Sequence, residues 1–262
     1  MKLSIIVLNY KSKNLVKYFL KNVLNFNFDF NWEIVVVDNV SNDGINKLLK
    51  EQFPVVKFIG SPKNIGMGAG NNLGIKNSQG DYLLIVNPDI TLNQASVQKL
   101  VDFLNQNPQV AIAGPKMINP DGSRQNTCYH WPKFLTFIYR RTWLGTTSVG
   151  KKHLRQFLYS SDELKKPKQV DWLLGGCFLV RRKAFDEVGL FDEKFFLFLE
   201  DTDLCRRMWQ KNWQVWYIPQ AAIIHLPHRL SAGERTIKDA FSRLTWIHLI
   251  SWLKYFWKWR SG

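Results

Sequence analysis

Hydrophobic positions along the first 120 residues follow two alternating periods. Residues 3–8 and 33–37 are short apolar runs that end in polar residues, whereas residues 15–24 place apolar side chains at helical spacing. This order predicts a βαβ unit, and it continues with helices over 46–52 and 68–76 and strands over 55–59 and 82–86. We therefore predict an α/β fold with a mostly parallel, doubly wound sheet flanked by helices.

The pattern changes after Pro120. Residues 133–168 hold nine Lys or Arg against two acidic residues, interleaved with aromatic side chains, and we predict a partly ordered excursion from the sheet. Regular structure returns with a strand over 172–181 that passes through two glycines. The remaining predicted elements are a helix over 203–212, a strand over 214–218 and a final helix over 236–259.

Composition indicates one domain with a basic second part. The 262 residues are 45% hydrophobic, and no linker-like stretch divides them. The first 120 residues carry 12 Lys against 8 acidic residues, so most of the net charge of +15 lies beyond them and is expected to meet an anionic partner. Three widely spaced cysteines without a CxxC pair argue against disulfides and structural zinc. Met1 and Lys2 lead into a strand rather than a signal peptide, which favours the cytosol or the cytosolic side of a membrane.

A metal site is predicted where the strand over 82–86 ends. Asn87-Pro88-Asp89 follows that strand, and a carboxylate there suits Mg²⁺ or Mn²⁺ bound to a diphosphate. The alternative for Asp89 is a turn residue after proline. Asn87 stands where metal-dependent transferases commonly carry an acid, so a further ligand is desirable. His225, after the apolar run 221–224, is the candidate, and His228 competes with it.

Two other polar segments are candidates for nucleotide contacts. Asp38, Asn39 and Asp43 follow the strand over 33–37, where ribose hydroxyls and a base edge can be held, although helix capping explains the same residue types. The glycine-rich stretch 64–72 opens a helix and favours either an anionic group or tight helix–sheet packing. Neither a GxGxxG after the first strand nor a P-loop pattern is present, which disfavours dinucleotide and P-loop proteins.

The acidic pair Glu200 and Asp201 is the candidate for proton transfer. It follows the apolar run 195–199, which would keep a general base partly dry, and we expect one carboxylate to orient substrate while the other accepts a proton. An acidic helix start is the alternative. Arg206 and Arg207 are either ion-pair partners on that helix or clamps for a diphosphate.

Taken in order, these segments resemble the family 2 inverting glycosyltransferases, within them the rhamnosyltransferase-like members. The resemblance covers roughly residues 3–230 and rests on six segments in the family's order, which are 3–10, 36–44, 64–74, 87–89, 174–181 and 198–207. It implies a GT-A fold in which Asp38 contacts the base or ribose, Asp89 and His225 hold Mg²⁺ or Mn²⁺, and Asp201 is the catalytic base. Asn87 in place of an acid is a variant typical of the rhamnosyltransferase-like subgroup.

The resemblance also implies the wider site and its partners. The nucleotide-sugar contacts would be Leu8, Asn9, Tyr10, Asp38, Asn39, Asp43, Asn64, Gly66, Asn71 and Asn87. The acceptor contacts would be Trp172, Gly175, Gly176, Glu200 and Arg207. Residues 1–235 would form the GT-A domain, with a nucleotide-sugar half over 1–120 and an acceptor half over 121–235. The donor would be a dTDP or UDP sugar, with dTDP-rhamnose favoured, and the acceptor a polyprenyl-diphosphate-linked saccharide used in cell-surface polysaccharide synthesis.

Two other classes of protein compete with this interpretation. A nucleic-acid-binding protein explains the basic, aromatic second half, but its phosphates would be repelled by Asp38, Asp89 and the pair at 200–201. We therefore predict no nucleic-acid partner. A sugar-binding protein of the same fold without catalysis is the second alternative.

Residues 236–262 form the last predicted unit, a basic aromatic amphipathic helix. Its apolar stripe comprises Phe241, Leu244, His248, Trp252, Tyr255 and Trp259, at intervals of three and four. No acidic residue follows Asp239. We predict that this stripe lies on an anionic membrane surface, which would place the protein peripherally on the inner face of the cell membrane. The alternative is that the stripe packs on the protein's own core or on a second subunit.

Overall fold

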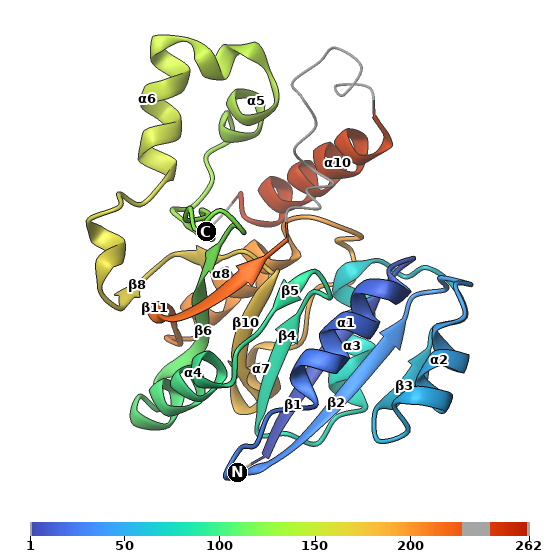
Figure 1. The fold of residues 1–262 in the computed structure, drawn as a ribbon. Helices are drawn as coiled ribbons and strands as arrows, with labels where there is room; N and C mark the ends of the chain where they lie inside the picture. The colour runs from blue at the N-terminus through green and yellow to red at the C-terminus, as the bar shows by residue number, and fades with distance from the viewer. Residues whose placement is uncertain (1, 227–241, 261–262) are drawn as a thin grey trace.

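A nine-stranded sheet organises the computed structural model, which describes residues 2–226 and 242–260 (Figure 1). The strand order is β3-β2-β1-β4-β10-β6-β11-β5, and β8 pairs with β11. The strands are β1 Lys2–Asn9, β2 Asn31–Asp38, β3 Lys57–Gly60, β4 Tyr82–Val86, β5 Ile90–Thr91, β6 Val110–Ile118, β8 Lys168–Gln169, β10 Cys177–Arg181 and β11 Gln214–His225. A separate pair is formed by β7 Cys128–Tyr129 and β9 Trp172–Leu173.

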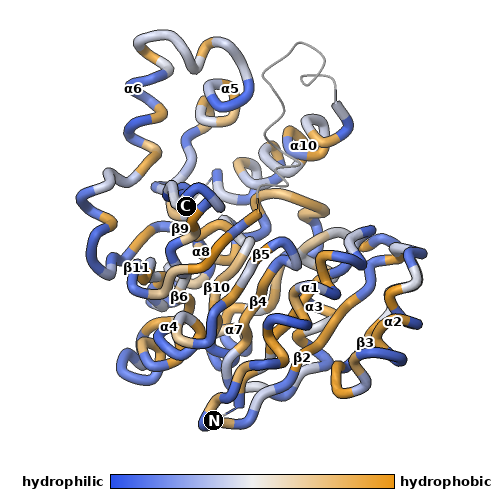
Figure 2. The backbone as a smooth tube through the Cα atoms, in the orientation of Figure 1, coloured by the Kyte–Doolittle hydropathy of each residue, from blue (hydrophilic) through white to orange (hydrophobic). Residues whose placement is uncertain are grey.

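The sheet separates two hydrophobic clusters because successive side chains of a strand point to opposite faces. Ile5 and Val7 of β1 belong to the cluster covered by α1, α2 and α4, whereas Ile6 belongs to the cluster covered by α3, α7 and α8. Figure 2 shows the hydrophobic residues gathered along the central strands. The helices are α1 Lys13–Val23, α2 Ile45–Gln52, α3 Met67–Lys76, α4 Gln94–Gln106, α5 Thr136–Arg141, α6 Ser148–Phe157, α7 Arg182–Val188, α8 Glu200–Gln210 and α10 Arg243–Lys258, with short 3-10 helices η1 Trp143–Thr146 and η2 Glu163–Lys165.

Strand direction brings several polar strand ends to one edge of the sheet. Strands β1, β2, β3 and β4 are parallel to one another, and β6 and β11 are parallel to each other. Strand β10 is antiparallel to both β4 and β6, so β6 runs in the same direction as β4. The predicted mostly parallel α/β sheet flanked by helices is confirmed. The carboxyl ends of β1, β2, β4, β6 and β11 therefore share one edge.

Several predicted element boundaries are wrong. The strand expected over 172–181 is two strands, β9 and β10, because the chain turns at Gly175 and Gly176. The third strand begins at Lys57, since Val55 is exposed. Strand β11 extends to His225, past the predicted end at 218. Helix α4 and strand β6 were not predicted.

The basic segment 133–168 is more regular than expected. It forms α5, η1, α6, η2 and the start of β8. Its aromatic residues explain this order, because Phe157 stacks on Tyr129 and Phe134 contacts Trp252 of α10. The final helix begins at Arg243, and the part predicted over 236–241 lies outside the described residues, as does His228.

Candidate active site

The two predicted metal ligands lie next to each other at the shared edge of the sheet. Strand β11 pairs with β5 so that His225 stands opposite Ile90, the residue after Asp89. The Nε2 atom of His225 is 3.4 Å from Oδ2 of Asp89, and both side chains are mostly buried. The other carboxylate oxygen of Asp89, Oδ1, is buried without a hydrogen-bond partner. Two residues 136 positions apart in the sequence thus form one polar pair.

Gln125 fixes the orientation of the His225 ring. Its Oε1 lies 2.7 Å from Nδ1 of His225, while its Nε2 donates to Asn119 Oδ1 at 2.6 Å and to the His225 carbonyl at 3.2 Å. Because the amide nitrogen is used by two acceptors, Oε1 accepts from Nδ1–H, and the lone pair of a neutral ring is then on Nε2, facing Asp89. No motif or periodic pattern marks Gln125, which lies in a loop a hundred residues from its partner.

This donor set fits a divalent cation. A lone pair aimed at a carboxylate is unfavourable unless a proton or a cation lies between them, and the unpartnered Oδ1 adds a second free oxygen. Within the described residues there is no group of three or more His, Cys, Asp or Glu side chains arranged for a metal. Asp89 and His225 would therefore hold the ion together with oxygens from another source, as is usual for Mg²⁺ or Mn²⁺ bound to phosphates.

The turn at 175–176 links this edge to the acidic pair. The carbonyl of Gly176 accepts the amide N–H of Asn87 at 2.9 Å, and the amide of Gly175 donates to Oδ2 of Asp201 at 2.7 Å. A Cβ at Gly175 would stand 3.3 Å from the same carboxylate oxygen, which is closer than most real Cβ contacts. A glycine here lets the Asp201 carboxylate approach the backbone. The segment after β4 and the start of α8 therefore meet at one turn.

Glu200 and Asp201 are buried neighbours with different hydrogen bonding. Their exposed fractions are 4% and 6%. The Asp201 carboxylate accepts from the amides of Gly175 and Thr202, both at 2.7 Å, whereas Oε2 of Glu200 is buried without a partner. Hydrogen bonds to backbone N–H groups favour an ionised carboxylate, and an unpartnered buried one favours the protonated form.

Burial raises the pKa of both carboxyl groups. Desolvation, together with the charge of Asp201, raises the pKa of Glu200 from 4.5 to about 8. Desolvation also raises the pKa of Asp201 from 3.8, opposed by its hydrogen bonds to Gly175 and Thr202. Because Asp201 accepts from the amides of two other residues whereas Oε2 of Glu200 has no partner, the charge of the pair is favoured on Asp201 and the proton on Glu200. This charge state leaves Asp201 as the proton acceptor.

The raised pKa of Glu200 predicts a pH-dependent stability. Between pH 4.5 and about pH 8 the unfolded chain releases a proton that the folded chain retains, so this group makes the free energy of unfolding fall as pH rises through that range. We expect Glu200→Gln to remove most of this slope, a difference of roughly 4 kcal/mol at most between its two ends. Urea unfolding of the wild type and of Glu200→Gln at pH 5 and pH 8.5 measures the change in the free energy of unfolding. Parallel pH dependences would show that Glu200 is already ionised in the folded protein.

The loop before the acidic pair packs against the glycine-rich start of α3. A Cβ at Gly66 would come within 2.4 Å of the carbonyl oxygen of Phe196, and the Met67 amide donates to that carbonyl at 2.8 Å. Gly66 also has a φ of +89°, which favours glycine. Phe198 and Leu199 have φ values of 71° and 66°, a left-handed conformation that is uncommon for such residues and is held by its surroundings. Tight packing thus explains Gly66.

The polar residues at the ends of β1 and β2 are joined into one network. Nδ2 of the buried Asn9 donates to Asp38 at 2.9 Å and to Ser41 at 2.8 Å, and it lies 3.2 Å from Asp43. Asp43 also accepts from the amides that open α1 and α2, at Lys13 and Ile45. Asp43 therefore caps helices, as the alternative interpretation held, and Asn9 organises the loops around it. The partly exposed Asp38 stays the predicted contact for the nucleoside.

Asn39 and Asn64 connect that network to the glycine-rich stretch. Nδ2 of Asn39 donates to Asn64 Oδ1 at 3.0 Å, and Oδ1 of Asn39 accepts from the Ile65 amide at 2.9 Å. Both side chains are thus used by the protein itself. Of the other predicted nucleotide contacts, Tyr10 is exposed, Leu8 packs on Gly70, and Asn71 is buried within α3. Their contacts with a donor stay predictions.

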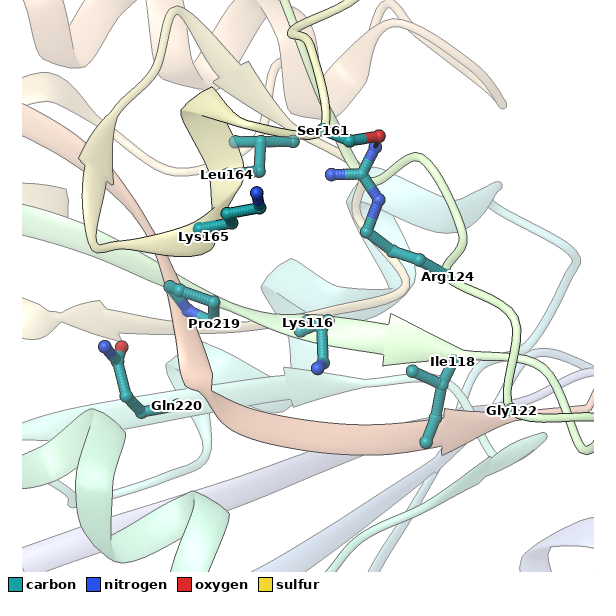
Figure 3. A pocket seen from close by; sticks show the side chains of 9 residues that line it. All are labelled: Lys116, Ile118, Gly122, Arg124, Ser161, Leu164, Lys165, Pro219 and Gln220. Carbon is teal, nitrogen blue, oxygen red and sulfur yellow. Dashed lines mark hydrogen bonds between the residues drawn. The ribbon is translucent and has the colours of Figure 1, made fainter.

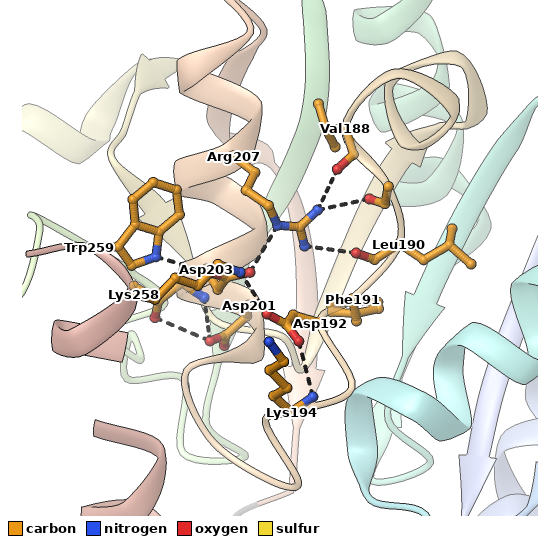
Figure 4. Close-up of polar contacts among 12 residues, drawn as sticks. Val188, Leu190, Phe191, Asp192, Lys194, Asp201, Asp203, Arg207, Lys258 and Trp259 are labelled. Carbon is orange, nitrogen blue, oxygen red and sulfur yellow. Dashed lines mark hydrogen bonds and ion pairs between the residues drawn. The ribbon is translucent and has the colours of Figure 1, made fainter. Parts of the chain in front are cut away.

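Two predicted acceptor contacts, Trp172 and Arg207, bond to other parts of the chain. The Trp172 ring is buried, stacks on Tyr129 and donates from Nε1 to the His130 carbonyl at 3.0 Å. Arg207 donates to Asp203 at 2.9 Å and to three backbone carbonyls of residues 188–190 (Figure 4). The polar atoms of both side chains are thus occupied by the chain itself, and their contact with an acceptor stays a prediction.

Asp203 ties α8 to the carboxyl-terminal helix. It is fully buried, and beside Arg207 its carboxylate meets Lys258 Nζ at 2.7 Å and Trp259 Nε1 at 3.0 Å (Figure 4). Lys258 also pairs with Asp192 at 2.7 Å, which lowers the pKa of that carboxyl against the opposing effect of burial. The helix that starts with the acidic pair is thus anchored by charges from α10.

A cavity of about 470 Å³ lies beside β6 and β11, outside the site described so far (Figure 3). Its lining residues are Lys116, Ile118, Gly122, Arg124, Ser161, Leu164, Lys165, Pro219 and Gln220. None of them belongs to the predicted site. Arg124 and Lys165 already contact Ser161 and Asp162, at 3.3 Å and 2.6 Å. We assign this cavity no role.

The fold and the position of the carboxylates define a GT-A-like α/β protein. In a solved structure of GalNAc-T7 with UDP, GalNAc and Mn²⁺, the similar region covers 91% of this chain and 46% of that one, with a TM-score of 0.67 at 17% identity. A second similar structure is the mannosyltransferase PcManGT from Pyrobaculum calidifontis in complex with GDP-Man and Mn²⁺. The similar region covers 87% of this chain and 58% of that one, with a TM-score of 0.58 at 16% identity. The sequence profile of glycosyl transferase family 2 matches residues 4–189, and the chain belongs to this family.

Curated relatives include rhamnosyltransferases. The chain is 28% identical over 212 residues to N-acetylglucosaminyl-diphospho-decaprenol L-rhamnosyltransferase of Mycobacterium tuberculosis, a match that covers 73% of this chain and 66% of the relative. It is 24% identical to the rhamnosyltransferase WbbL of Escherichia coli K12, and this match covers 96% of this chain and 91% of WbbL. The chain thus spans just under two thirds of the length of the mycobacterial protein. The predicted resemblance to family 2 and to its rhamnosyltransferase-like members is confirmed.

Proposed function

We propose that this glycosyltransferase moves L-rhamnose from dTDP-rhamnose to a polyprenyl-diphosphate-linked saccharide during the synthesis of cell-surface polysaccharide. The rhamnosyltransferase relatives support the donor, and the decaprenol-linked substrate in the name of the mycobacterial relative supports the acceptor. Such an acceptor is held in a membrane, which favours a peripheral position on its cytoplasmic face. None of the described helices is long and apolar enough to cross a membrane.

The observation that carries the proposal is the turn that joins two chemically different carboxylates. Asp89 and His225 would together hold a cation at a diphosphate, and Asp201, linked to the same turn through Gly175, is the member of the buried acidic pair on which charge is favoured. A nucleoside-diphosphate sugar needs both groups, one at the leaving diphosphate and one at the attacking hydroxyl. A binding protein without catalysis has no need of the second.

In the proposed mechanism Asp201 removes the proton of an acceptor hydroxyl as it attacks the anomeric carbon. The bond to the diphosphate breaks on the opposite side, so a single displacement inverts the configuration and the proton ends on Asp201. Mg²⁺ or Mn²⁺ bound by Asp89 and His225 would neutralise charge on the diphosphate. Glu200 stays protonated and keeps the neighbouring charge on Asp201, while the apolar loop before it limits access of water.

A donor panel tests the proposal. The full-length protein is incubated with Mn²⁺, a polyprenyl-diphosphate-linked N-acetylglucosamine and, in separate reactions, dTDP-rhamnose, UDP-N-acetylglucosamine, UDP-galactose and GDP-mannose. We expect transfer, measured as release of nucleoside diphosphate and as product mass, to be fastest with dTDP-rhamnose. Faster transfer from a UDP sugar would replace rhamnose by that sugar. Absence of transfer from every donor would overturn the proposal.

A further inference from the structure

The carboxyl-terminal helix α10 has two apolar faces, and the predicted stripe is the inward one. Trp252 and Tyr255 are buried in a cluster with Phe195 and Leu199, the loop that leads to the acidic pair. Within the described residues this confirms the alternative that the stripe packs on the protein's own core, and Phe241 lies outside them. The membrane contact predicted for this stripe is therefore wrong.

A second stripe on α10 faces outward. Trp246, Ile250, Leu253 and Trp257 follow one another at intervals of four, three and four residues, which places them on one side of a helix. Their exposed fractions are 53%, 48%, 50% and 68%. A row of four large apolar residues left in water along one helix calls for a partner.

Contacts with the loop before the acidic pair keep α10 from rotating to bury this row. Ser251 Oγ donates to the Leu197 carbonyl and Lys254 Nζ to the Lys194 carbonyl, both at 2.8 Å. His248 stacks on Phe198, and burial, together with the charges of Arg141 and Arg140, lowers the pKa of that histidine to about 3. The outward row is thus held at the surface by the contacts of the opposite face.

A basic surface continues from α10 onto α5, which faces it in Figure 1, and from there onto α6, which packs on α5. Phe134 contacts Trp252 and Phe256, and Arg141 contacts His248 at 2.6 Å, so the two regions pack on each other. Residues 133–160 hold six Lys or Arg and residues 240–262 hold four, and neither stretch contains Asp or Glu. Four further large apolar side chains in the first stretch are exposed, namely Phe134, Leu135, Trp143 and Val149.

We propose that the outward row of α10, together with the basic surface of α5 and α6, binds the surface of a membrane that contains anionic lipid. Tryptophan and aliphatic side chains flanked by Lys and Arg suit the boundary between head groups and acyl chains. The inference rests on the proposed function, since it names the surface through which the enzyme meets the membrane that holds its acceptor. It also places the loop before Glu200 and Asp201, which α10 contacts, next to that membrane.

Two other partners fit this surface less well. A second copy in an isologous contact would bring the cations of these two stretches against the same cations. Lys258 is already paired with Asp192 and Asp203, but neither stretch contains an acid that could offset the others across such a contact. A nucleic acid would match the charge, but Ile250 and Leu253 cannot stack on bases and would be placed against phosphates. An anionic lipid surface supplies both the charge and the apolar phase.

Vesicle sedimentation tests the inference on the full-length protein. The probes are vesicles of phosphatidylcholine alone and of phosphatidylcholine mixed with phosphatidylglycerol, at low salt. The variant changes Trp246, Ile250, Leu253 and Trp257 to Gln. The control changes Tyr18 and Val55 to Gln, because both are exposed apolar residues away from α10, on α1 and in the turn before β3. We expect the wild type and the control to sediment with the anionic vesicles only, and the variant to lose about tenfold or more in partitioning.

Further measurements separate the possible outcomes. A thermal unfolding midpoint equal to that of the wild type shows that the variant is folded. A second variant, Lys151→Glu with Lys152→Glu, should weaken vesicle binding and its dependence on salt. The inference is overturned if the wild type does not sediment with anionic vesicles, if the four-residue variant sediments as the wild type does, or if that variant changes only oligomeric size or binding to single-stranded DNA.

Transfer to an acceptor with a short, water-soluble lipid tail distinguishes this inference from the proposed function. The four-residue variant should transfer to that acceptor at the wild-type rate, because it leaves Asp89, His225 and Asp201 untouched. Vesicle binding without any transfer would contradict the proposed function and leave the membrane surface standing. Sugar transfer without vesicle binding would support the proposed function and contradict the membrane surface.

Discussion

Replacing Asp201 by Asn is expected to slow sugar transfer by ~10²–10⁴, the loss usual for removal of a general base. The substitution keeps the size of the side chain but removes the only charged carboxylate of the acidic pair. Binding of the donor should change little, since its diphosphate is expected at Asp89. The rate is measured as release of nucleoside diphosphate in the presence of acceptor, and donor binding by thermal shift with the same nucleotide sugar.

The matched control for this prediction is Glu200→Gln, which keeps Asp201 and imitates the protonated form of its neighbour. This control should retain far more activity than Asp201→Asn. The wild type should lose activity as pH falls through the pKa of Asp201, and because burial raises that pKa, the loss should begin at a higher pH than for an ordinary carboxylate. Transfer by Asp201→Asn at the wild-type rate would move the role of base to Glu200.

Replacing Asp89 by Ala is the second change with a large expected effect. It should weaken metal-dependent binding of the nucleoside diphosphate far more than binding of the nucleoside, because the partners of the metal are phosphate oxygens. The loss should exceed the ~10–100-fold typical of residues that only orient a ligand, the effect we expect for Gln125→Ala. Calorimetric titrations with the nucleoside diphosphate and with the nucleoside, each in the presence of Mn²⁺, measure the two affinities.

Two further variants serve as comparisons for Asp89→Ala. His225→Ala should show the same signature in milder form, and if it unfolds the protein the ligand assignment is wrong. Asp29→Ala removes an exposed carboxylate at a distant loop and should change neither affinity. Equal losses of nucleoside and nucleoside diphosphate binding in Asp89→Ala would mean that Asp89 has a structural role.

The sequence predicted the parts of the site that follow directly from strand order. The apolar run before Asn87 and the run before His225 indicated strand ends, and parallel strands bring their carboxyl ends to one edge, where Asp89 and His225 are 3.4 Å apart. The same reasoning placed Asp38. It could not separate contact residues from scaffold, because Asp43 caps helices and Gly66 accommodates the Phe196 backbone, and both patterns look alike in sequence.

Local sequence patterns did not predict contacts between residues that are far apart in the sequence. Gln125 has no periodic or motif signal, yet it orients His225 from across a loop. The anchoring of Asp203 by Lys258 depends on where the last helix docks, which its spacing alone does not determine. The same helix carries apolar residues on two faces, so periodicity identified a stripe but not which stripe is buried. In each case tertiary packing decided between arrangements that the local sequence allowed.

The anomeric configuration of the product tests the central claim most directly, that Asp201 drives a single displacement on a nucleoside-diphosphate sugar. NMR of the saccharide formed from dTDP-rhamnose early in the reaction should show the configuration opposite to that of the donor, with formation of this product strongly reduced in Asp201→Asn. A product that retains the configuration of the donor would require two displacements and a different nucleophile, and would contradict this account.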